Sequence, residues 1–355
     1  MKSCSDRNVG CRYFEATVDS NRVLFLENEL LRVTILPDNG CDIADINYKP
    51  NDISFLLRTR QGLQSLKKSH NKYTDRFNET YHGGWFEAFP NVGLSCTYES
   101  ISFEPYDEVK YLSWDFQVIK DEPDEVALMF SVKTLKTPFY LEKIIRICSR
   151  IPAIFIEETI TNNAREPFAF QWGHHPLLGQ PFLSADCVID FEGAAIDTFF
   201  EFENARVKQG EKGKWPKMAG KDKKLDIRAM PSPFADINDL YWLSNLQNNW
   251  IAVRNKKTGL GFGLAWDNRI FDHCLLWINA NGDKGYPHYG DLYTLCIMPS
   301  NTGIHTLEAE NRSGNPNILK PGGSISAWIT ASAFEHEGQS VQSISKNGEV
   351  TLKNT

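Results

Sequence analysis

The stretch IFIEETITNN, residues 154–163, best shows how this chain is built. In an extended chain, neighbouring side chains point to opposite sides, so every second residue shares a face. Isoleucines occupy one face here and mostly polar residues the other: Ile154, Ile156 and Ile160 against Phe155, Glu157, Thr159 and Thr161. Strands of antiparallel sheets often bury only one face, whereas buried parallel strands are apolar on both. The stretch therefore predicts a half-buried antiparallel strand.

The same alternation recurs along the chain, and Pro, Gly, Asn and Asp close each window. Further examples are NELLRVTILPDNG (28–40), VALMFSVKTL (126–135), FYLEKIIRICS (139–149), NWIAVRN (249–255) and SISAWITASAF (324–334). Helical periodicity is scarce, and only residues 51–68 have room for a turn or two. Because strands do not alternate with helices, a doubly wound sheet and a β/α barrel are excluded. We predict an all-β fold, either a large sandwich or a barrel.

The composition indicates an ordinary globular protein. Of the 355 residues, 41% are hydrophobic and 23% are charged, and the formal net charge is −7. The densest basic run, residues 212–224, is interrupted by Gly and Pro, so we expect a solvated loop within an excursion over residues 206–230. A nucleic-acid groove is the minor alternative, because the remainder of the chain is acidic. No Pro/Ser-rich linker divides the chain, so we expect one domain over residues 1–355 and no nucleic-acid partner.

The N-terminal stretch has no apolar core of signal-peptide length, and no segment approaches the roughly 18 apolar residues of a membrane span. We therefore expect a cytoplasmic protein without a membrane partner.

The eight cysteines are scattered and form no C-x-x-C pair. That spacing favours reduced, mostly buried thiols over disulfides or a zinc site.

Three segments are rich in residue types that form binding sites. The first, YHGGWFEAFPNVG at 81–93, sets His82 before two glycines and several aromatic residues. Glycines allow a positive φ or the close approach of a ligand, and aromatic rings offer flat apolar faces. A tight turn into a core strand, with Trp85 and Phe89 simply packed, explains the same residues.

The second segment, QWGHHPLLGQPF at 171–182, contains the adjacent histidines His174 and His175. Histidine titrates near neutral pH and so can give or take a proton. Neighbours in a strand point to opposite sides, so we expect one histidine to face a cleft and the other to turn into the sheet. A structural histidine is the alternative for either residue. Metal binding is disfavoured, because adjacent histidines do not easily bind one ion and no H-x-H or H-E-x-x-H spacing accompanies them.

The third segment, residues 286–329, contains a strand end at CIMPSNTG and a loop with Glu308 and Glu310. Carboxylates on such a loop are usually solvated. The chain has no nucleophile elbow, P-loop, dinucleotide fingerprint or calcium loop. Chemistry that depends on those motifs is therefore not expected.

Five pieces of this sequence, in their order, resemble the aldose 1-epimerases, also called galactose mutarotase-like proteins. The pieces are LENELLRVTILPDNGCDIADI, HGGWFEAFPNVG, ETITNNAREPFAFQWGHHPLLGQPFL, CIMPSNTG and ILKPGGSISAWI, and the match spans about residues 22–334. No single piece is specific, and their order and spacing carry the resemblance. It implies a large antiparallel β-sandwich that binds a small-molecule sugar in a cleft on one sheet. It further implies an isomerase that interconverts the α and β anomers without a cofactor or a metal.

The resemblance also implies roles for individual residues. His175, followed by Pro176 and an apolar pair, takes the place of the family's catalytic histidine. That histidine protonates the ring oxygen while a carboxylate removes the proton of the anomeric hydroxyl. The residues that would contact the sugar are His82, Trp85, Glu87, Asn91, Trp172 and His174.

One departure from the family bears on catalysis. The family's base is a glutamate directly before a proline, and here Met298 precedes Pro299, while Leu94 stands near the place of a family arginine. A thioether cannot remove a proton. Either another carboxylate is the base, or anomer exchange is lost and sugar binding is kept. The carboxylates to consider are Glu308, Glu310, Asp267 and Glu87.

Three functions follow from these residues. We favour an isomerase of the aldose 1-epimerase type involved in carbohydrate metabolism. The alternatives are a catalytically silent carbohydrate-binding protein, in which Trp85, Trp172 and Trp277 would stack on the sugar, and an enzyme with a different reaction in the same cleft. The identity of the sugar and the oligomeric state are open.

Overall fold

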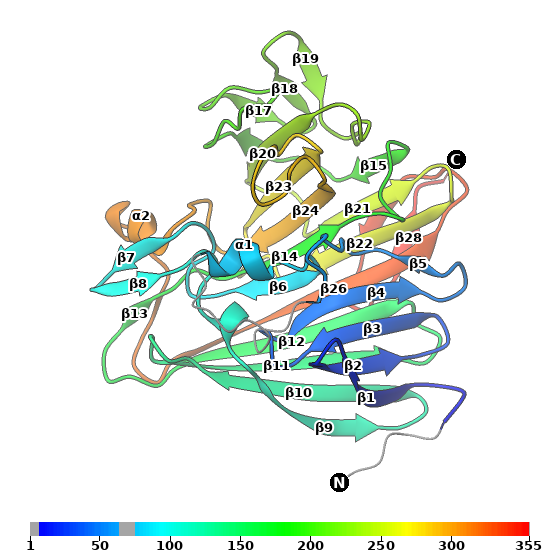
Figure 1. Ribbon diagram of the computed structural model, residues 1–355, viewed down its shortest axis with the longest axis vertical. Coiled ribbons are helices and arrows are strands. Elements are labelled where there is room, and N and C mark those ends of the chain that lie inside the picture. Colours follow the sequence, from blue (N-terminus) through cyan, green and yellow to red (C-terminus); the bar gives the residue numbers. More distant parts are fainter. Residues whose placement is uncertain (1–6, 64–74, 355) are drawn as a thin grey trace.

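The computed structural model describes residues 7–63 and 75–354, and nearly all of its regular structure is β. Two large antiparallel sheets pack face to face (Figure 1), and the main apolar core lies between them. This confirms the all-β prediction and identifies the architecture as a sandwich. The seven described cysteines form no disulfide. Among the described residues, no helix has the length and apolar character of a membrane span.

The first sheet has fourteen strands within the described ranges. In spatial order they are β1 (Arg12–Val18), β2 (Asn21–Glu27), β3 (Leu31–Leu36), β4 (Asp42–Tyr48), β6 (Trp85–Ala88), β14 (Gly173–Leu178), β24 (Tyr293–Ser300), β23 (His273–Ala280), β20 (Ile237–Ser244), β16 (Ala195–Asp197), β17 (Lys212–Lys214), β18 (Lys217–Ala219) and β19 (Lys224–Asp226), with β5 (Ile53–Ser54) beside β4. Strands that are distant in the sequence, β6, β14 and β24, are thus neighbours in the middle of this sheet.

The second sheet has eight strands in the part of the chain that is described. Their spatial order is β15 (Cys187–Asp190), β21 (Trp250–Asn255), β22 (Leu260–Trp266), β26 (Ser324–Glu335), β12 (Ala153–Asn162), β11 (Phe139–Cys148), β10 (Glu125–Lys133) and β9 (Asp115–Asp121). Short two-stranded pairs complete the β structure: β7 (Cys96–Tyr98) with β8 (Ile101–Phe103), β13 (Phe168–Ala169) with β25 (Ile318–Leu319), and β27 (Val341–Ile344) with β28 (Val350–Leu352). The described helices are α1 (Arg76–Thr80), α2 (Leu307–Arg312) and a 3₁₀ turn at Val109–Tyr111.

Strand β12 shows why the sequence forms this sandwich. Its isoleucines at 154, 156 and 160 are buried in the core, and Glu157 on the opposite face is exposed. The strand pairs with β11 on one side and β26 on the other. Glu158 shares the face of the isoleucines and is buried with them. A buried carboxylate needs partners, because an unpaired charge in an apolar interior is very costly.

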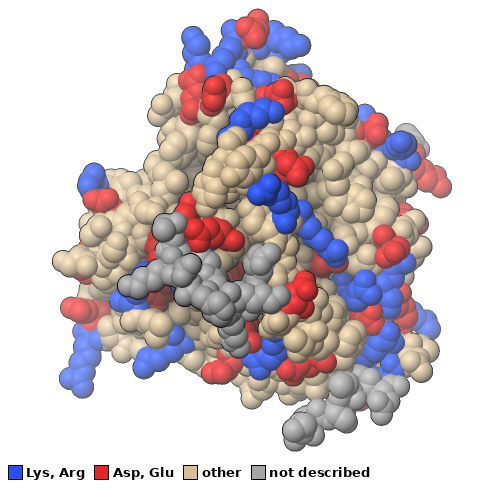
Figure 2. Space-filling view, in the orientation of Figure 1, with Lys and Arg blue, Asp and Glu red and all other residues tan. Residues whose placement is uncertain are grey.

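Three segments differ from the sequence-based expectation. The loop expected around Glu308 and Glu310 is helix α2, and Glu310 is buried in it. The basic run 212–224 forms β17, β18 and the start of β19 rather than a loop, since antiparallel pairing satisfies its backbone groups. Its lysines are exposed, and Figure 2 shows basic side chains gathered at this tip of the molecule. Residues 51–63 form β5 and isolated bridges without a helix, and residues 64–68 lie outside the described residues.

Strands β6 and β14 pair in a register that determines the site. His174 is opposite Glu87, and His175 is opposite Phe86. Because side chains alternate along a strand, the first pair points to the inner side of the sheet and the second pair to the outer side. The inner side faces the second sheet, and the outer side carries a separate apolar cluster around Phe86.

Candidate functional site

An aromatic cleft lies on the outer side of the first sheet. Its cavity measures about 210 Å³. Rings from several separate parts of the chain line it: Phe77, Tyr81, Tyr106, Phe200, Trp242 and Trp277. Most of these rings pack in the outer apolar cluster, which is separate from the main core. Flat rings of this kind provide large, rigid apolar contact surfaces for a ligand.

His175 is one of the residues that line this cleft. Its ring stacks on Phe86 with centroids 4.4 Å apart and meets Tyr106 edge-on at 5.1 Å. Its Nδ1 is buried and has no hydrogen-bond partner among the described residues. Burial, and secondly the positive charge of Lys110, lower the pKa of His175 to about 3. At neutral pH the ring is therefore uncharged, with one N–H donor and one nitrogen acceptor.

His288 also lines the cleft, from the loop between β23 and β24. Its Nε2 lies 3.7 Å from the carboxylate of Asp283, and its ring centroid lies 6.0 Å from that of Tyr81. Burial lowers the pKa of His288, although Asp283 opposes the shift. His288 was not predicted as a site residue, because YPHYGD is a loop without periodicity; its flanking tyrosines were the only signal. His305 is a third imidazole in the lining, and burial lowers its pKa as well.

Within the described residues, the lining of the cleft includes no carboxylate. The carboxylates that were considered as a base lie elsewhere: Glu308 pairs with Arg312 on α2, Glu310 accepts from Gln171 and Asn317, Asp267 pairs with Arg269 beyond β22, and Glu87 is enclosed between the sheets. The cleft therefore offers imidazole and phenol groups, but no anionic base.

Met298 lies on β24, directly across from His175. The pairing of Gly173 with Ser300 and of Leu177 with Cys296 sets this register. Met298 is buried in the outer apolar cluster. Its methyl group lies over Gly173, where an added Cβ would come within 2.8 Å of it. The position of the family's base is thus filled by an apolar side chain.

His82 lies outside the lining of the aromatic cleft, beside Asp42 and Lys110. Its Nε2 is 3.5 Å from Oδ2 of Asp42, and Nζ of Lys110 is 3.2 Å from the same oxygen. Burial, followed by the charge of Lys110, lowers the pKa of His82 to about 3. Burial raises the pKa of Asp42 to about 6, although Lys110 opposes the shift. His82 lines a separate hollow with Arg32 and Arg58, so any ligand that it contacts there lies outside the aromatic cleft.

A cluster of charged side chains is sealed between the two sheets. Nζ of Lys143 lies 2.7 Å from Glu87 and 3.3 Å from Glu158. His174 Nε2 lies 2.7 Å from the second oxygen of Glu158. Burial opposes the ionisation of Glu158, but His174 and Lys143 outweigh it and lower its pKa. Ligand atoms of Glu87, Glu158 and His174 lie within 4.8 Å of one another, and the ammonium group of Lys143 supplies the cation among them.

Two tryptophans complete this inner cluster. Trp172 donates from Nε1 to Glu87 at 2.8 Å, and Trp85 donates from Nε1 to Nδ1 of His174 at 3.3 Å. Four of the six residues that were expected to contact a sugar lie here: Trp85, Glu87, Trp172 and His174. Each is at most 2% exposed. They do not line the aromatic cleft, because strand alternation turns them toward the second sheet.

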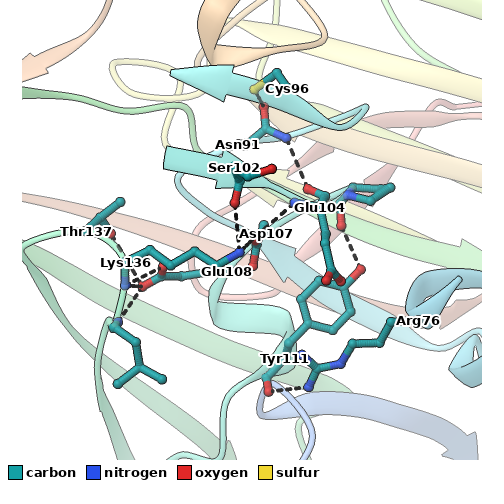
Figure 3. A network of polar contacts seen from close by, with 12 residues as sticks. Arg76, Asn91, Cys96, Ser102, Glu104, Asp107, Glu108, Tyr111, Lys136 and Thr137 are labelled. Carbon is teal, nitrogen blue, oxygen red and sulfur yellow. Dashed lines mark hydrogen bonds and ion pairs between the residues drawn. The ribbon is translucent and has the colours of Figure 1, made fainter. Parts of the chain in front are cut away.

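Asn91 fixes loops beside the cleft, and Figure 3 shows its amide between Cys96 and Glu104. Its Nδ2 also donates to the carbonyl of Leu94 at 2.8 Å, and its Oδ1 accepts from the backbone of Leu307 at 3.0 Å. The side chain is fully buried. Because Gly93 and Leu94 line the cleft, Asn91 shapes the wall of the cleft through the backbone.

Comparison with known proteins identifies the fold. No protein-family model and no curated protein matches the chain. Many solved structures do, among them a candidate aldose 1-epimerase from Klebsiella pneumoniae, with a TM-score of 0.73 and 15% identity over 92% of this chain and 85% of that one. A galactose mutarotase-like protein from Clostridium acetobutylicum has a TM-score of 0.61 and 13% identity over 92% of this chain and 99% of that one. A galactose mutarotase related enzyme from Lactobacillus acidophilus has a TM-score of 0.58 and 16% identity over 92% and 99%. The chain has the galactose mutarotase-like fold, as predicted.

Proposed function

We propose that this protein binds the ring of a sugar in the aromatic cleft, as a carbohydrate-binding protein with the fold of the mutarotases. The observation that carries the proposal is His175, an uncharged imidazole with an unpartnered, buried nitrogen in a cleft walled by aromatic rings. A buried polar atom without a partner costs about 1–3 kcal/mol. A ligand hydroxyl that reaches this nitrogen removes the cost.

A sugar ring matches both kinds of surface in the cleft. Its C–H groups pack against flat rings such as Trp242 and Trp277, which line the cavity. Its hydroxyls donate and accept hydrogen bonds, as the uncharged rings of His175, His288 and His305 also do. Ligand sites commonly combine a mostly apolar lining with a few polar groups that fix orientation.

A second candidate function is anomer exchange, which the presence of His175 and His288 in one cleft favours. In this reaction a base removes the proton of the anomeric hydroxyl, and an acid protonates the ring oxygen as the bond from C1 to that oxygen breaks. Rotation about C1–C2 and closure, with the proton transfers reversed, give the other anomer. His288 is placed to act as the base, because Asp283 at 3.7 Å stabilises the imidazolium that forms. His175 occupies the position of the family's acid.

Binding is the better supported of the two functions. General acid–base catalysis is most efficient when the pKa lies near the operating pH, and the pKa of His175 is about 3. No carboxylate among the described residues lines the cleft. We therefore expect exchange to be slower by roughly 10²- to 10⁴-fold than at a site with a matched acid and base.

The test is a titration of ¹⁵N-labelled protein with glucose, galactose and glucose 6-phosphate, followed by saturation transfer between anomers in the same samples. We expect the indole signals of Trp242 and Trp277 to shift, and His175→Ala to weaken binding about tenfold through the lost hydrogen bond. His336→Ala is the matched control, since His336 is also buried but does not line the cleft.

Equal affinities of His175→Ala and His336→Ala for every sugar that binds would contradict the proposal. Signal shifts confined to residues outside the cleft would contradict it as well. Exchange above the spontaneous rate, lost in both His175→Ala and His288→Ala, would establish the second candidate. Exchange that survives both substitutions would exclude these two imidazoles as the acid and the base.

A further inference from the structure

A second hollow adjoins the aromatic cleft, where β16, β20 and β23 meet the segment around α2. Its volume is about 430 Å³. Polar side chains dominate its lining, among them Asp197, Ser244, Asp272, His273, Asn301 and Asn315. We call this space the polar hollow. Its lining also includes residues of the CIMPSNTG segment and Glu310, one of the carboxylates considered as a base.

The polar hollow and the aromatic cleft share their walls. Trp242 lines both spaces. Phe199 lines the hollow and Phe200 lines the cleft, and in the same way Ile304 lines the hollow and His305 the cleft. On β20, Leu240, Trp242 and Ser244 share one face, and they line the cleft, both spaces and the hollow in turn, so the two spaces lie side by side. A ligand longer than one ring can extend from one into the other.

Trp242, which lines both spaces, has an indole nitrogen without a hydrogen-bond partner in the described part of the chain. Trp242 is 3% exposed, and its Nε1 has no acceptor among the described residues. Other buried indoles do donate, as Trp172 does to Glu87. A buried N–H without an acceptor costs about 1–3 kcal/mol. An oxygen of a ligand at the boundary of the two spaces would satisfy it.

Several groups in the polar hollow are available to hydroxyls. Ser244 and Asn315 make no side-chain hydrogen bond within residues 7–63 and 75–354. The carboxylate of Asp272 lies 2.7 Å from Nδ1 of His273 and keeps a second oxygen for other donors. Hydroxyl, amide and carboxylate groups together offer both donors and acceptors. This mixture suits a ligand that is rich in hydroxyl groups.

We propose that the two spaces are adjacent subsites for one neutral carbohydrate of at least two rings. The aromatic cleft holds one ring by stacking, and the polar hollow holds the next ring by hydrogen bonds, with Trp242 contacting both. This inference rests on the proposed function and adds the substrate class to it. The ligand is a disaccharide or a longer glycan rather than a single sugar.

The charges in the polar hollow favour a neutral ligand. Asp197, Asp272 and Glu310 line it, and none of its described lining residues is Lys or Arg. Lys212 reaches Asp197 at 3.4 Å, but its side chain is 82% exposed. Like charges repel more strongly where water is partly excluded. A sugar phosphate or a sugar acid in this subsite is therefore disfavoured.

The test compares single sugars with their disaccharides by calorimetry: glucose with maltose and cellobiose, and galactose with lactose. We expect at least one disaccharide to bind about tenfold more tightly than its single sugars, since two or more new hydrogen bonds form. In Asn315→Ala and Asp272→Asn the affinity for the disaccharide should exceed that for its single sugars by only about twofold or less, and the affinity for the single sugars should be unchanged. We call this difference in affinity the disaccharide gain. Asp226→Asn is the control, because Asp226 lies in a surface ion pair on β19. Asn315 is exposed, so its replacement does not endanger folding.

The outcomes separate this inference from the proposed function. Single sugars that bind in the cleft, with no disaccharide gain, would overturn the inference and leave the proposed function intact. A disaccharide gain that Asn315→Ala and Asp272→Asn retain would also overturn it, because the second ring would then lie elsewhere. No binding of any sugar, with the protein folded, would overturn both. Loss of the disaccharide gain in these variants but not in Asp226→Asn would support it.

Discussion

The two sides of strand β14 carry adjacent histidines in opposite surroundings. On the inner side, His174 belongs to a sealed cluster in which each charge faces an opposite charge or a donor at short distance. On the outer side, His175 is packed among aromatic rings, and its Nδ1 has no hydrogen-bond partner in the described part of the chain. Within the described residues, two inner oxygens, Oε2 of Glu87 and Oε1 of Glu158, also make no hydrogen bond, but the ammonium group of Lys143 lies 2.7 and 3.3 Å from them, whereas Nδ1 of His175 has no ion-pair partner either. A polar atom without either kind of partner, rather than the number of charged residues, therefore points to the outer side of this sheet as the binding side.

The largest expected effect comes from breaking the inner cluster at its only lysine. Lys143→Met leaves Glu87 and Glu158 buried without their cation, and removing one partner of a buried ion pair typically costs about 3–5 kcal/mol. We expect a loss of that size in the free energy of unfolding from urea denaturation. The control is Lys346→Met, since Lys346 and Glu157 form a half-exposed pair at 3.6 Å. Such a pair contributes about 1 kcal/mol or less.

Equal losses for Lys143→Met and Lys346→Met would contradict this contrast. They would mean that water or protonation already balances the inner carboxylates. A large loss for Lys143→Met alone would show that the ion pairs are needed for the two sheets to pack.

A second prediction adds a carboxylate beside the aromatic cleft, whose described lining includes none. Met298→Glu places an acid group across from His175 at the position of the family's base. If the cleft binds sugars as we propose, saturation transfer should show anomer exchange roughly 100-fold faster than in the unaltered protein. Met298→Gln has the same shape without the acid and should show no increase. An equal rate in both variants would mean that the cleft cannot bring a sugar's anomeric centre to this position.

The third prediction is a pH effect on stability. The pKa of His175 falls from 6.5 to about 3 on folding, so between these pH values the unfolded chain binds more protons than the folded one. The free energy of unfolding therefore decreases as the pH falls below 6.5, by up to about 1.4 kcal/mol per pH unit from this group. In His175→Gln this contribution is absent. The stability difference between the two proteins should shift in favour of the variant from pH 7 to pH 5.

The third prediction compares the unaltered protein with His175→Gln, so that the contributions of other titrating groups to the stability difference cancel. His82 acts in the same direction as His175, with its pKa lowered to about 3, and Asp42 acts in the opposite direction, with its pKa raised to about 6. Both remain in His175→Gln, and so does Lys110. Parallel pH profiles of the two proteins would show that His175 is not buried uncharged.

Strand periodicity was sufficient to predict an all-β fold and the opposite directions of the two histidines, and the family resemblance chose the sandwich over the barrel. It also contained a signal for the inner cluster, because Glu158 follows Ile154 and Ile156 on the buried face of β12. A carboxylate in that register requires a buried partner. The partner itself, Lys143, lies on the neighbouring strand β11, and only the pairing of strands brings the two together.

The lining of the cleft was less predictable. His288, Phe200 and His305 come from loops, whose paths no periodicity encodes, and they meet only because of the sheet order. Contact of Trp85 or His174 with a sugar stays a prediction taken from the family, and in this chain both face the second sheet.

Lys143 fixes a positive charge inside a set of possible metal ligands. Glu87, Glu158 and His174 present ligand atoms within 4.8 Å of one another, a grouping of oxygen and nitrogen donors that a divalent ion also uses. Here a covalently attached ammonium group, 2.7 Å from Glu87 and 3.3 Å from Glu158, provides a counter-charge to both carboxylates. For protein design, the same position is the natural place to exchange a side chain for a metal, because shortening one lysine opens a preorganised set of ligands in a rigid sandwich.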